Sequence, residues 1–440
     1  MARYFADAAQ VTVSISRAIR MTIPSVTPQE RRLAICAFSY FFMLLAGYYV
    51  LRPLRDQMGI AGGVKALPWM FLATFLTLIV AQPLYGTLVK MLSRRRFIAI
   101  VYQFFVANLG VFWILLTWHF STVTVARIFF VWVSVFNLFA VAVFWSLMAD
   151  VFTSEQGKRL FGFIGAGGTA GSLVGPAVTV GLSVPLGPTN LLLVAALFLE
   201  AALFCVWQLE RTLEPKGHAS RTKPIGGSAF SGFAALLRSR YLMGIALWVS
   251  LMSLGATILY LEQAHLVADN VHGAGVQTRL FASMDLTVGV LALITQLLAT
   301  GPVLRRLGTG GSAAALPVVY TVGFAAMAVV PSIAVVFVFQ VAQRWINFAV
   351  ANPARQVLFT VVARDDKYKA KNMIDVVVFR GSDALYASLF DGLQALSLKI
   401  TAIAACALPV VIGWLFLSTR LGRAQERLAV ELGAAAAQTD

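Results

Sequence analysis

Long apolar stretches separated by short polar segments dominate the sequence. Each is about as long as the roughly 20 apolar residues that a helix needs to cross a bilayer. None alternates apolar and polar residues over about ten positions, as a transmembrane β-strand does. The pattern therefore predicts an all-α membrane protein with twelve transmembrane helices. The twelve stretches cover residues 33–56, 67–89, 97–118, 123–149, 160–184, 190–208, 241–266, 280–300, 313–330, 332–351, 373–395 and 398–418.

Composition excludes a water-soluble fold. Of the 440 residues, 59% are hydrophobic and 12% are charged, whereas about a quarter of an ordinary soluble domain is charged. Residues 1–32 lack the basic, apolar and small-residue succession of a cleaved signal peptide. Residues 11–23 are typical of a short basic amphipathic segment on the membrane surface. We therefore expect a cytoplasmic N-terminal segment.

The net charge of +16 raises the question of a nucleic-acid partner, which the distribution of the charge answers. With the N-terminus inside, the tails and even-numbered loops hold 27 of the 35 basic residues; five lie on the opposite side and three within spans. This is the positive-inside asymmetry. It predicts a multi-pass protein of the cell inner membrane with both termini in the cytoplasm, in contact with lipid and not with nucleic acid.

The longest polar interruption, at 209–240, contains Pro215, Pro224 and several glycines, and is typical of a linker. It separates a bundle at 33–208 from a bundle at 241–418, and a cytoplasmic tail follows at 419–440. Features recur across it at an offset of about 215 residues. The sequence GTLVK at 86–90 and the arginines at 94–96 match GPVLRR at 301–306, and Asp150 to Arg159 matches Asp365 to Lys371.

Two parallel six-helix halves, with a basic loop after the second helix of each, are the layout of the major facilitator superfamily. The first of these loops resembles that superfamily's G-x-x-x-D-R/K-x-G-R-R/K signature in part, with Lys90 at the position of the acid and Ser93 at the second glycine. The sequence therefore predicts two pseudo-symmetric six-helix bundles of the major facilitator type.

Ionisable residues within spans are costly and are candidates for a transport pathway. Arg52 and Arg55 share a helix face at i, i+3 near the end of the first span, beside Pro53. They either bind an anion or extend to the outer headgroups, with Arg52 paired to Asp56. In the alignment of the two halves, Glu262 falls opposite Arg52, and this pair could form a gate.

Arg344 is the leading single candidate, because it lies twelve residues into its span, about 18 Å deep at 1.5 Å per residue. The alternative is a structural pair with Asp285 or Glu262. Arg380 and Asp383 are i, i+3 partners and are expected to neutralise each other.

The candidates fall into three groups. The substrate-binding candidates are Arg52, Arg55, Arg127, Arg344 and Arg380. The coupling or gating candidates are Glu262, Asp285 and Asp383. The candidates for cytoplasmic gate loops are Asp150, Lys158, Arg159, Lys367 and Lys371. No metal site, disulfide or cofactor is expected, because Cys36, Cys205 and Cys406 lie in separate spans and the four histidines are scattered.

Small residues recur every three or four positions in the segment 162–176. Its G-x-G-x-x-A string resembles a dinucleotide-binding loop, but no strand precedes it and it lies in a span. Such spacing lets two helices approach closely. We therefore expect a packing surface on which the helices also rock.

Three further motifs carry a resemblance to a known family. LRPLRD at 51–56, FW at 144–145 with KRLF at 158–161, and KYKAKNMID at 367–375 resemble the ATP/ADP translocase family of plastids and obligate intracellular bacteria and its shorter bacterial relatives. The resemblance implies nucleotide exchange across the inner membrane, with Arg55 helping to bind phosphate. The family's acidic residue in helix 4 has no counterpart between Ile128 and Ser146. The substrate therefore stays open.

The leading hypothesis is a secondary transporter that works by alternating access around a site lined by helices 1, 4, 7 and 10. The excess of arginines over acids favours a small anionic or phosphorylated solute, with nucleotide exchange as one form. No P-loop is present, so a gradient must drive transport. The alternative is a non-transporting assembly or signalling protein with the same fold. An enzyme would need a cluster of catalytic residues at one depth, and the sequence contains none. We expect a monomer.

Overall fold

The computed structural model describes residues 27–91, 94–212, 236–362, 370–371, 373–398 and 400–437, and within these ranges it contains helices and no strand. The first half of the chain forms α2 (Pro28–Ala61), α3 (Leu67–Met91), α4 (Arg94–Thr117), α5 (Thr122–Val151), α6 (Ser154–Leu182) and α7 (Leu191–Thr212), with a short 3-10 turn η1 (Val64–Ala66) before α3. We call α2 to α7 the N-half.

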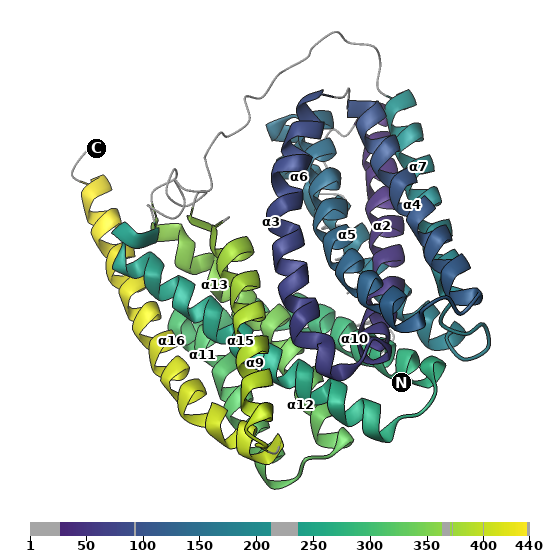
Figure 1. Cartoon of the computed structure of the whole chain (residues 1–440). Coiled ribbons are helices and arrows are strands. Elements are labelled where there is room, and N and C mark those ends of the chain that lie inside the picture. The colour runs from purple at the N-terminus through teal and green to yellow at the C-terminus, as the bar shows by residue number, and fades with distance from the viewer. Residues whose placement is uncertain are drawn as a thin grey trace, which may run out of the picture.

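The second half contains α9 (Arg240–Asn270), α10 (Ala274–Leu298), α11 (Thr300–Val329), α12 (Ile333–Ile346) and α13 (Asn352–Leu358), then α15 (Phe379–Ala395) and α16 (Ile400–Ala437). Two π-helical segments, η2 (Asn347–Ala351) and η4 (Met373–Val378), join α12 to α13 and precede α15, and a 3-10 turn η3 (Phe359–Val361) follows α13. We call α9 to α16 the C-half. Figure 1 shows the N-half on one side of the molecule and most of the C-half on the other.

The predicted all-α membrane class is confirmed. Within the described residues, eleven helices are long and apolar enough to cross a membrane. The remaining predicted span, 373–395, is also helical, as η4 and α15. Its sequence carries Asp375, Arg380, Asp383 and Asp391, which lowers its hydropathy. The boundaries 33–208, 209–240 and 241–418 stay predictions.

Two helices run further than the hydropathy pattern predicts. The helix α2 continues through Pro53 to Ala61, so Arg52 and Arg55 lie within it and not near its end. The helix α16 continues from the membrane span through the expected tail to Ala437. Hydropathy marks where a chain leaves lipid, but helix-forming residues such as the alanines and leucines after 420 keep the backbone helical beyond that point.

The glycine-rich face of α6 packs on α2, which confirms the predicted packing surface. A Cβ atom on Gly167 would lie 2.5 Å from the carbonyl oxygen of Phe38, and one on Gly171 would overlap the backbone at Phe42. Such separations are too short for any side chain larger than hydrogen. Small residues therefore let the two backbones approach closely.

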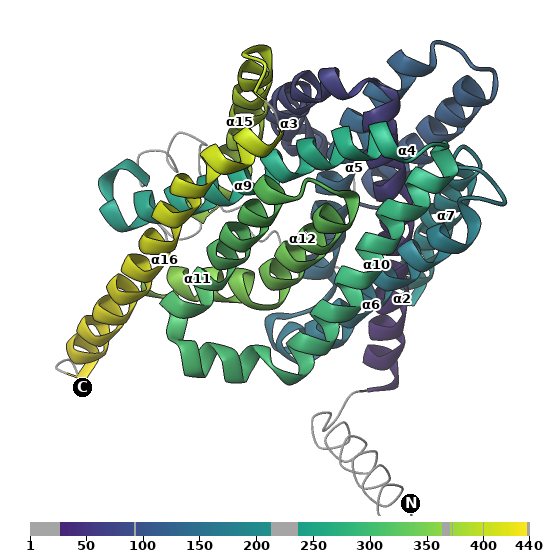
Figure 2. The same ribbon diagram turned by 90° about the horizontal axis from the view of Figure 1, so that it is seen from below.

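The two halves meet through a few helices. The helix α6 packs on α10, α2 also contacts α10, and α3 packs on α15; Figure 2 shows α10 beside α2 and α6. Separate apolar clusters fill the two halves: one draws on α2, α4, α5, α6 and α7, and the other draws mainly on the C-half. Side chains from both halves therefore come together along this contact.

Candidate functional site

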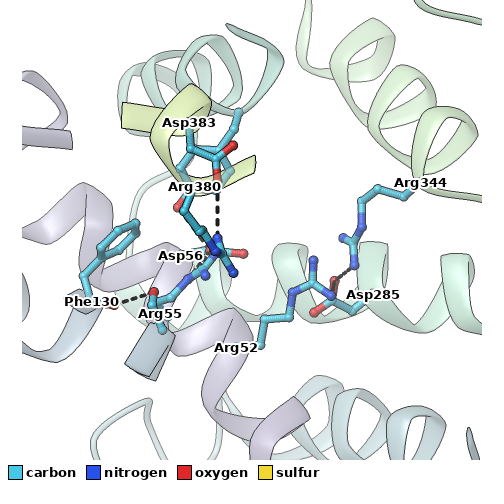
Figure 3. A network of polar contacts seen from close by, with 10 residues as sticks. Arg52, Arg55, Asp56, Phe130, Asp285, Arg344, Arg380 and Asp383 are labelled. Carbon is cyan, nitrogen blue, oxygen red and sulfur yellow. Dashed lines mark hydrogen bonds and ion pairs between the residues drawn. The ribbon is translucent and has the colours of Figure 1, made fainter. Parts of the chain in front are cut away.

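A cluster of two arginines and one carboxylate joins the two halves. Asp285 of α10 lies 2.5 Å from an Nη atom of Arg344 on α12 and 3.8 Å from an Nη atom of Arg52 on α2. The Asp285 side chain is only 2% exposed. Figure 3 shows Arg52 and Arg344 approaching it from different elements. One carboxylate thus serves two guanidinium groups, and the cluster holds one surplus positive charge.

The cluster contains buried polar atoms that make no hydrogen bond to the described residues. The second carboxylate oxygen of Asp285 and Nε of Arg344 are buried, and neither has a hydrogen-bond partner among the described residues. A small cavity of about 170 Å³ lies against them, lined also by Tyr49, Thr169 and Gln296. Buried polar atoms without partners are rare in proteins and call for an explanation such as a missing ligand or water.

A second polar contact joins the halves near Arg55. The Arg55 guanidinium pairs with Asp56 at 2.7 Å, and the Tyr260 hydroxyl of α9 donates to the same Asp56 oxygen at 3.1 Å. The guanidinium also lies 5.1 Å from the ring centroid of Phe130. Arg55, and not Arg52, is therefore the partner of Asp56, because the next residue along the helix turns its carboxylate toward it.

Arg380 and Asp383 form the expected i, i+3 pair at 3.3 Å. Asp383 also accepts hydrogen bonds from the hydroxyl groups of Ser253 at 2.5 Å and Thr257 at 3.4 Å, both on α9. The buried carboxylate is therefore well satisfied and ties α15 to α9 within the C-half.

A larger cavity of about 370 Å³ lies between the halves. The N-half contributes Leu78 and the neighbouring pair Asn137 and Leu138. The C-half contributes Met252, Asn347, Asn352, Arg355, Asp375, Phe379 and Arg380. Both π-helical segments reach it, through Asn347 of η2 and Asp375 of η4. Single π-helical turns inside longer helices are frequent at functional sites.

One arginine in this wall, Arg355, lies elsewhere than the sequence pattern predicts. Arg355 was counted with the basic residues of a cytoplasmic loop, yet it lies in α13 with an Nη atom 3.1 Å from Asp375. The apolar stretch predicted to end at residue 351 extends through α13 to Leu358. The signal that could have found the pair was the unusual position of Asp375 inside a span.

The comparisons with known proteins give the fold. No protein-family model matches the chain, and no curated protein matches it by sequence. Three solved structures resemble it, two of bacterial homologues of transporters and one of a nucleoside transporter, each over 91% of this chain and 99% of its own. A homologue of the iron transporter ferroportin, in an inward-facing state, has a TM-score of 0.62 at 12% identity. A homologue of the lysosomal transporter Spinster, also inward-facing, has a TM-score of 0.58 at 13% identity.

The nucleoside transporter NupG has a TM-score of 0.53 at 14% identity. Each of the three structures can be superposed on this chain over nearly its whole length. The fold is of the major facilitator type.

Helices 1, 4, 7 and 10 of this fold were expected to line the site. The residues that line the larger cavity come instead from α3, α5, α9, the α12–α13 helix and the η4–α15 helix. In chain order these are transmembrane helices 2, 4, 7, 10 and 11.

Within the major facilitator fold, Glu262 does not meet Arg52. Glu262 is fully buried in α9, and both of its carboxylate oxygens lack a hydrogen-bond partner among the described residues. Asp285 takes the position beside Arg52 instead. Aligning two helices by sequence offset sets their register but not their rotation about their own axes. Glu262 and Arg52 therefore share no hydrogen bond in this structure, and the gate between them stays a prediction.

Two of the cytoplasmic gate candidates, Arg159 and Lys371, make contacts within their own halves. Arg159 pairs with Glu30 at 3.3 Å, and the Lys371 ammonium donates to Gln356 at 2.6 Å. Asp150 lies exposed at the end of α5. Lys367 and the side chain of Lys158 lie outside the described part of the chain. No group of three His, Cys, Asp or Glu residues that could hold a metal ion occurs among the described residues.

Arg127 lies apart from the arginine cluster. Its Nε donates at 2.7 Å to the carbonyl oxygen of Gly62, which follows the last turn of α2. It satisfies a carbonyl at a helix end, where backbone acceptors lack helical partners. The surrounding groove, formed by α3, α4 and α5, is almost wholly apolar.

We therefore expect Arg127→Gln to lower the free energy of unfolding by about 1 kcal/mol and to leave substrate affinity unchanged. Thermal unfolding in detergent and the KM for uptake measure the two effects. The conservative Arg127→Lys change serves as the control for stability. A clear rise in KM with unaltered stability would instead assign Arg127 to the substrate site.

Proposed function

We propose that this protein is a secondary transporter that carries a small organic or phosphorylated anion by alternating access. The observation that carries the proposal is the sharing of Asp285 by Arg52 and Arg344. This cluster bridges the two halves, is largely buried, and has one positive charge more than it has negative. A bound anion would supply the missing charge.

The charges around the site make this cluster distinctive. The pairs Arg55–Asp56, Arg355–Asp375 and Arg380–Asp383 are each electrically balanced. Leaving an unpaired charge in a buried site is costly. Arginine also offers a planar fork of donors that fits carboxylate and phosphate oxygens. The balance of charge therefore favours an anion at Arg52 and Arg344.

Competition for the guanidinium groups would couple binding to movement. Asp285 belongs to the C-half and Arg52 to the N-half, so their ion pair must break when the halves separate at this point. A substrate anion would compete with Asp285 for the same donors. Binding would thereby weaken a contact that holds the halves together. Such differential contact is what lets a ligand shift a conformational equilibrium.

The size of the cavity bears on the substrate. The cavity beside Asp285 and Arg344 has a volume of about 170 Å³, which is smaller than the roughly 300–1,000 Å³ usual for small-molecule pockets. Nucleotides belong in the test because of the family resemblance, but Arg55, the implied phosphate ligand, is engaged by Asp56. We rank smaller carboxylate or phosphate anions first. The proposal includes an inner-membrane location with both termini in the cytoplasm.

The test is uptake into proteoliposomes of labelled carboxylates, phosphorylated metabolites, ATP and ADP, with an ion or counter-substrate gradient. We expect saturable uptake of at least one anion, and a loss of at least about 30-fold in kcat/KM in Arg52→Gln, because one guanidinium ligand to the anion is removed. Arg279→Gln is the matched control, since Arg279 is an exposed arginine on the same helix as Asp285.

Two results would contradict the proposal. Uptake of a neutral or cationic solute in place of any anion would remove the charge argument. No gradient-dependent uptake of any solute, by protein that is folded and inserted, would favour the non-transporting alternative.

A further inference from the structure

A large basic groove lies at the ends of α9 and α16, away from the arginine cluster between the halves. Its volume is about 1240 Å³. Four arginines line it, and all four are exposed: Arg240, Arg420, Arg423 and Arg427. Glu426 and Glu431 are the acids in the same lining. The groove therefore carries two surplus positive charges.

The spacing along α16 puts basic and apolar residues on neighbouring stripes. Arg420, Arg423 and Arg427 are separated by three and four residues, so they share one side of the helix. Leu417, Leu421 and Leu428 follow the same kind of spacing and also line the groove. The helix thus presents a basic stripe beside an apolar stripe, which is typical of a segment at a membrane surface.

Contacts with α9 form the floor of the groove. A Cβ atom on Gly244 would lie 2.8 Å from the Leu421 side chain, so the absence of a side chain there lets the helices approach. One turn further along α9, the Trp248 indole donates to the Ser418 hydroxyl at 2.9 Å. The two helices are therefore held together immediately below the arginines.

Three of the arginines, Arg240, Arg420 and Arg423, lie next to the membrane boundary that the sequence predicts. The apolar stretch of α16 ends at residue 418, and that of α9 begins at residue 241. Arg420 and Arg423 follow the first boundary by two and five residues, or about 3 and 8 Å of helix, and Arg240 directly precedes the second. The headgroup layer is about 5–8 Å thick on each side. Figure 2 shows α16 running on past the neighbouring helices toward its C-terminal end.

We propose that this groove binds an anionic phospholipid, with the phosphate groups at Arg240, Arg420 and Arg423 and an acyl chain beside Leu417 and Leu421 at the membrane boundary. The surplus of two positive charges matches a lipid that carries two phosphates, such as a diphosphatidylglycerol. Basic pockets between transmembrane helices at the membrane surface are suited to such headgroups. The apolar wall distinguishes a lipid from free phosphate, because free phosphate gains nothing from it.

The experiment measures lipid binding to the full-length protein by native mass spectrometry in detergent. Titrations with diphosphatidylglycerol, phosphatidylglycerol and phosphatidylcholine give the apparent Kd of each. We expect the order of affinity to follow the number of phosphates, with no saturable binding of phosphatidylcholine. Millimolar inorganic phosphate should not displace the bound lipid. In Arg420→Gln/Arg423→Gln, the Kd for diphosphatidylglycerol should rise about fivefold per arginine, or about 25-fold.

The matched control is Arg31→Gln/Arg32→Gln. These arginines are exposed at the start of α2, on the face where α7 ends, since Gln29 donates to the Thr212 carbonyl. The variant loses the same charge on the same face. Arg420→Lys/Arg423→Lys keeps the charge and should bind the lipid within about threefold of the parent, and binding at that level shows that the variant is folded. Equal weakening in both glutamine variants, or none in either, would overturn the proposal, and displacement by inorganic phosphate would assign the groove to a free anion.

Discussion

Arg344→Gln is expected to lower saturable anion uptake by at least about 100-fold, or about 3 kcal/mol. Arg344 lies closest to Asp285, at 2.5 Å, and its side chain is 14% exposed. Without it, Asp285 retains only the distant Arg52, and the cluster changes from one surplus positive charge to none. An anion then has no net attraction to the site. Uptake into proteoliposomes at several substrate concentrations measures the loss.

Further variants separate the chemistry of binding from the stability of the fold. Arg344→Lys keeps a charge but not the planar fork, so partial uptake with a raised KM is expected. Arg344→Gln keeps the balanced pair of Arg52 and Asp285, whereas Arg344→Gln/Asp285→Asn leaves Arg52 without a counter-charge and should be less stable still. Its uptake should stay low. Recovery of transport in this double variant would show that the pair is purely structural and would remove Arg344 from the site.

Gly171→Ala is expected to lower the free energy of unfolding by about 1–3 kcal/mol. The new Cβ would overlap the backbone at Phe42 on α2, and a backbone cannot swing aside as a side chain can. The two helices would have to move apart along the whole glycine-rich face. Thermal unfolding of the purified protein in detergent measures the change.

The same helix supplies the matched control. A Cβ on Gly165 would meet no atom within 4 Å beyond its own helix. Gly165→Ala should therefore be neutral or slightly stabilising, because alanine is the better helix former by about 1 kcal/mol. A similar loss of stability in both variants would mean that the helix needs glycine for its backbone and not for contact with α2.

The sequence was sufficient for the architecture because crossing a bilayer demands long apolar helices. The runs at 123–149 and 190–208 correspond closely to α5 and α7. The pairing of Arg380 with Asp383 also followed from helix periodicity alone. The spacing of small residues in 162–176 predicted a packing face, although it did not identify α2 as the partner.

The partners of the remaining charges depended on how separate helices rotate and approach, which no local pattern records. Arg52 meets Asp285 and not Glu262, and Arg127 meets a backbone carbonyl that carries no sequence signal. The role of Arg355 in the cavity wall was missed for a different reason. A basic residue near the end of an apolar stretch has the same appearance whether it faces the cytoplasm or closes a cavity wall.

The shared carboxylate has a consequence for the return of the empty carrier. Asp285 is closer to Arg344, which moves with the same half, than to Arg52 across the contact. Separation of the halves without cargo would leave Arg52 without a counter-charge in a largely buried position, and such a charge is costly. On the proposed function, the loaded protein reorients more readily than the empty one. Transport would then be a one-for-one exchange of anions across the membrane rather than a net flux in one direction.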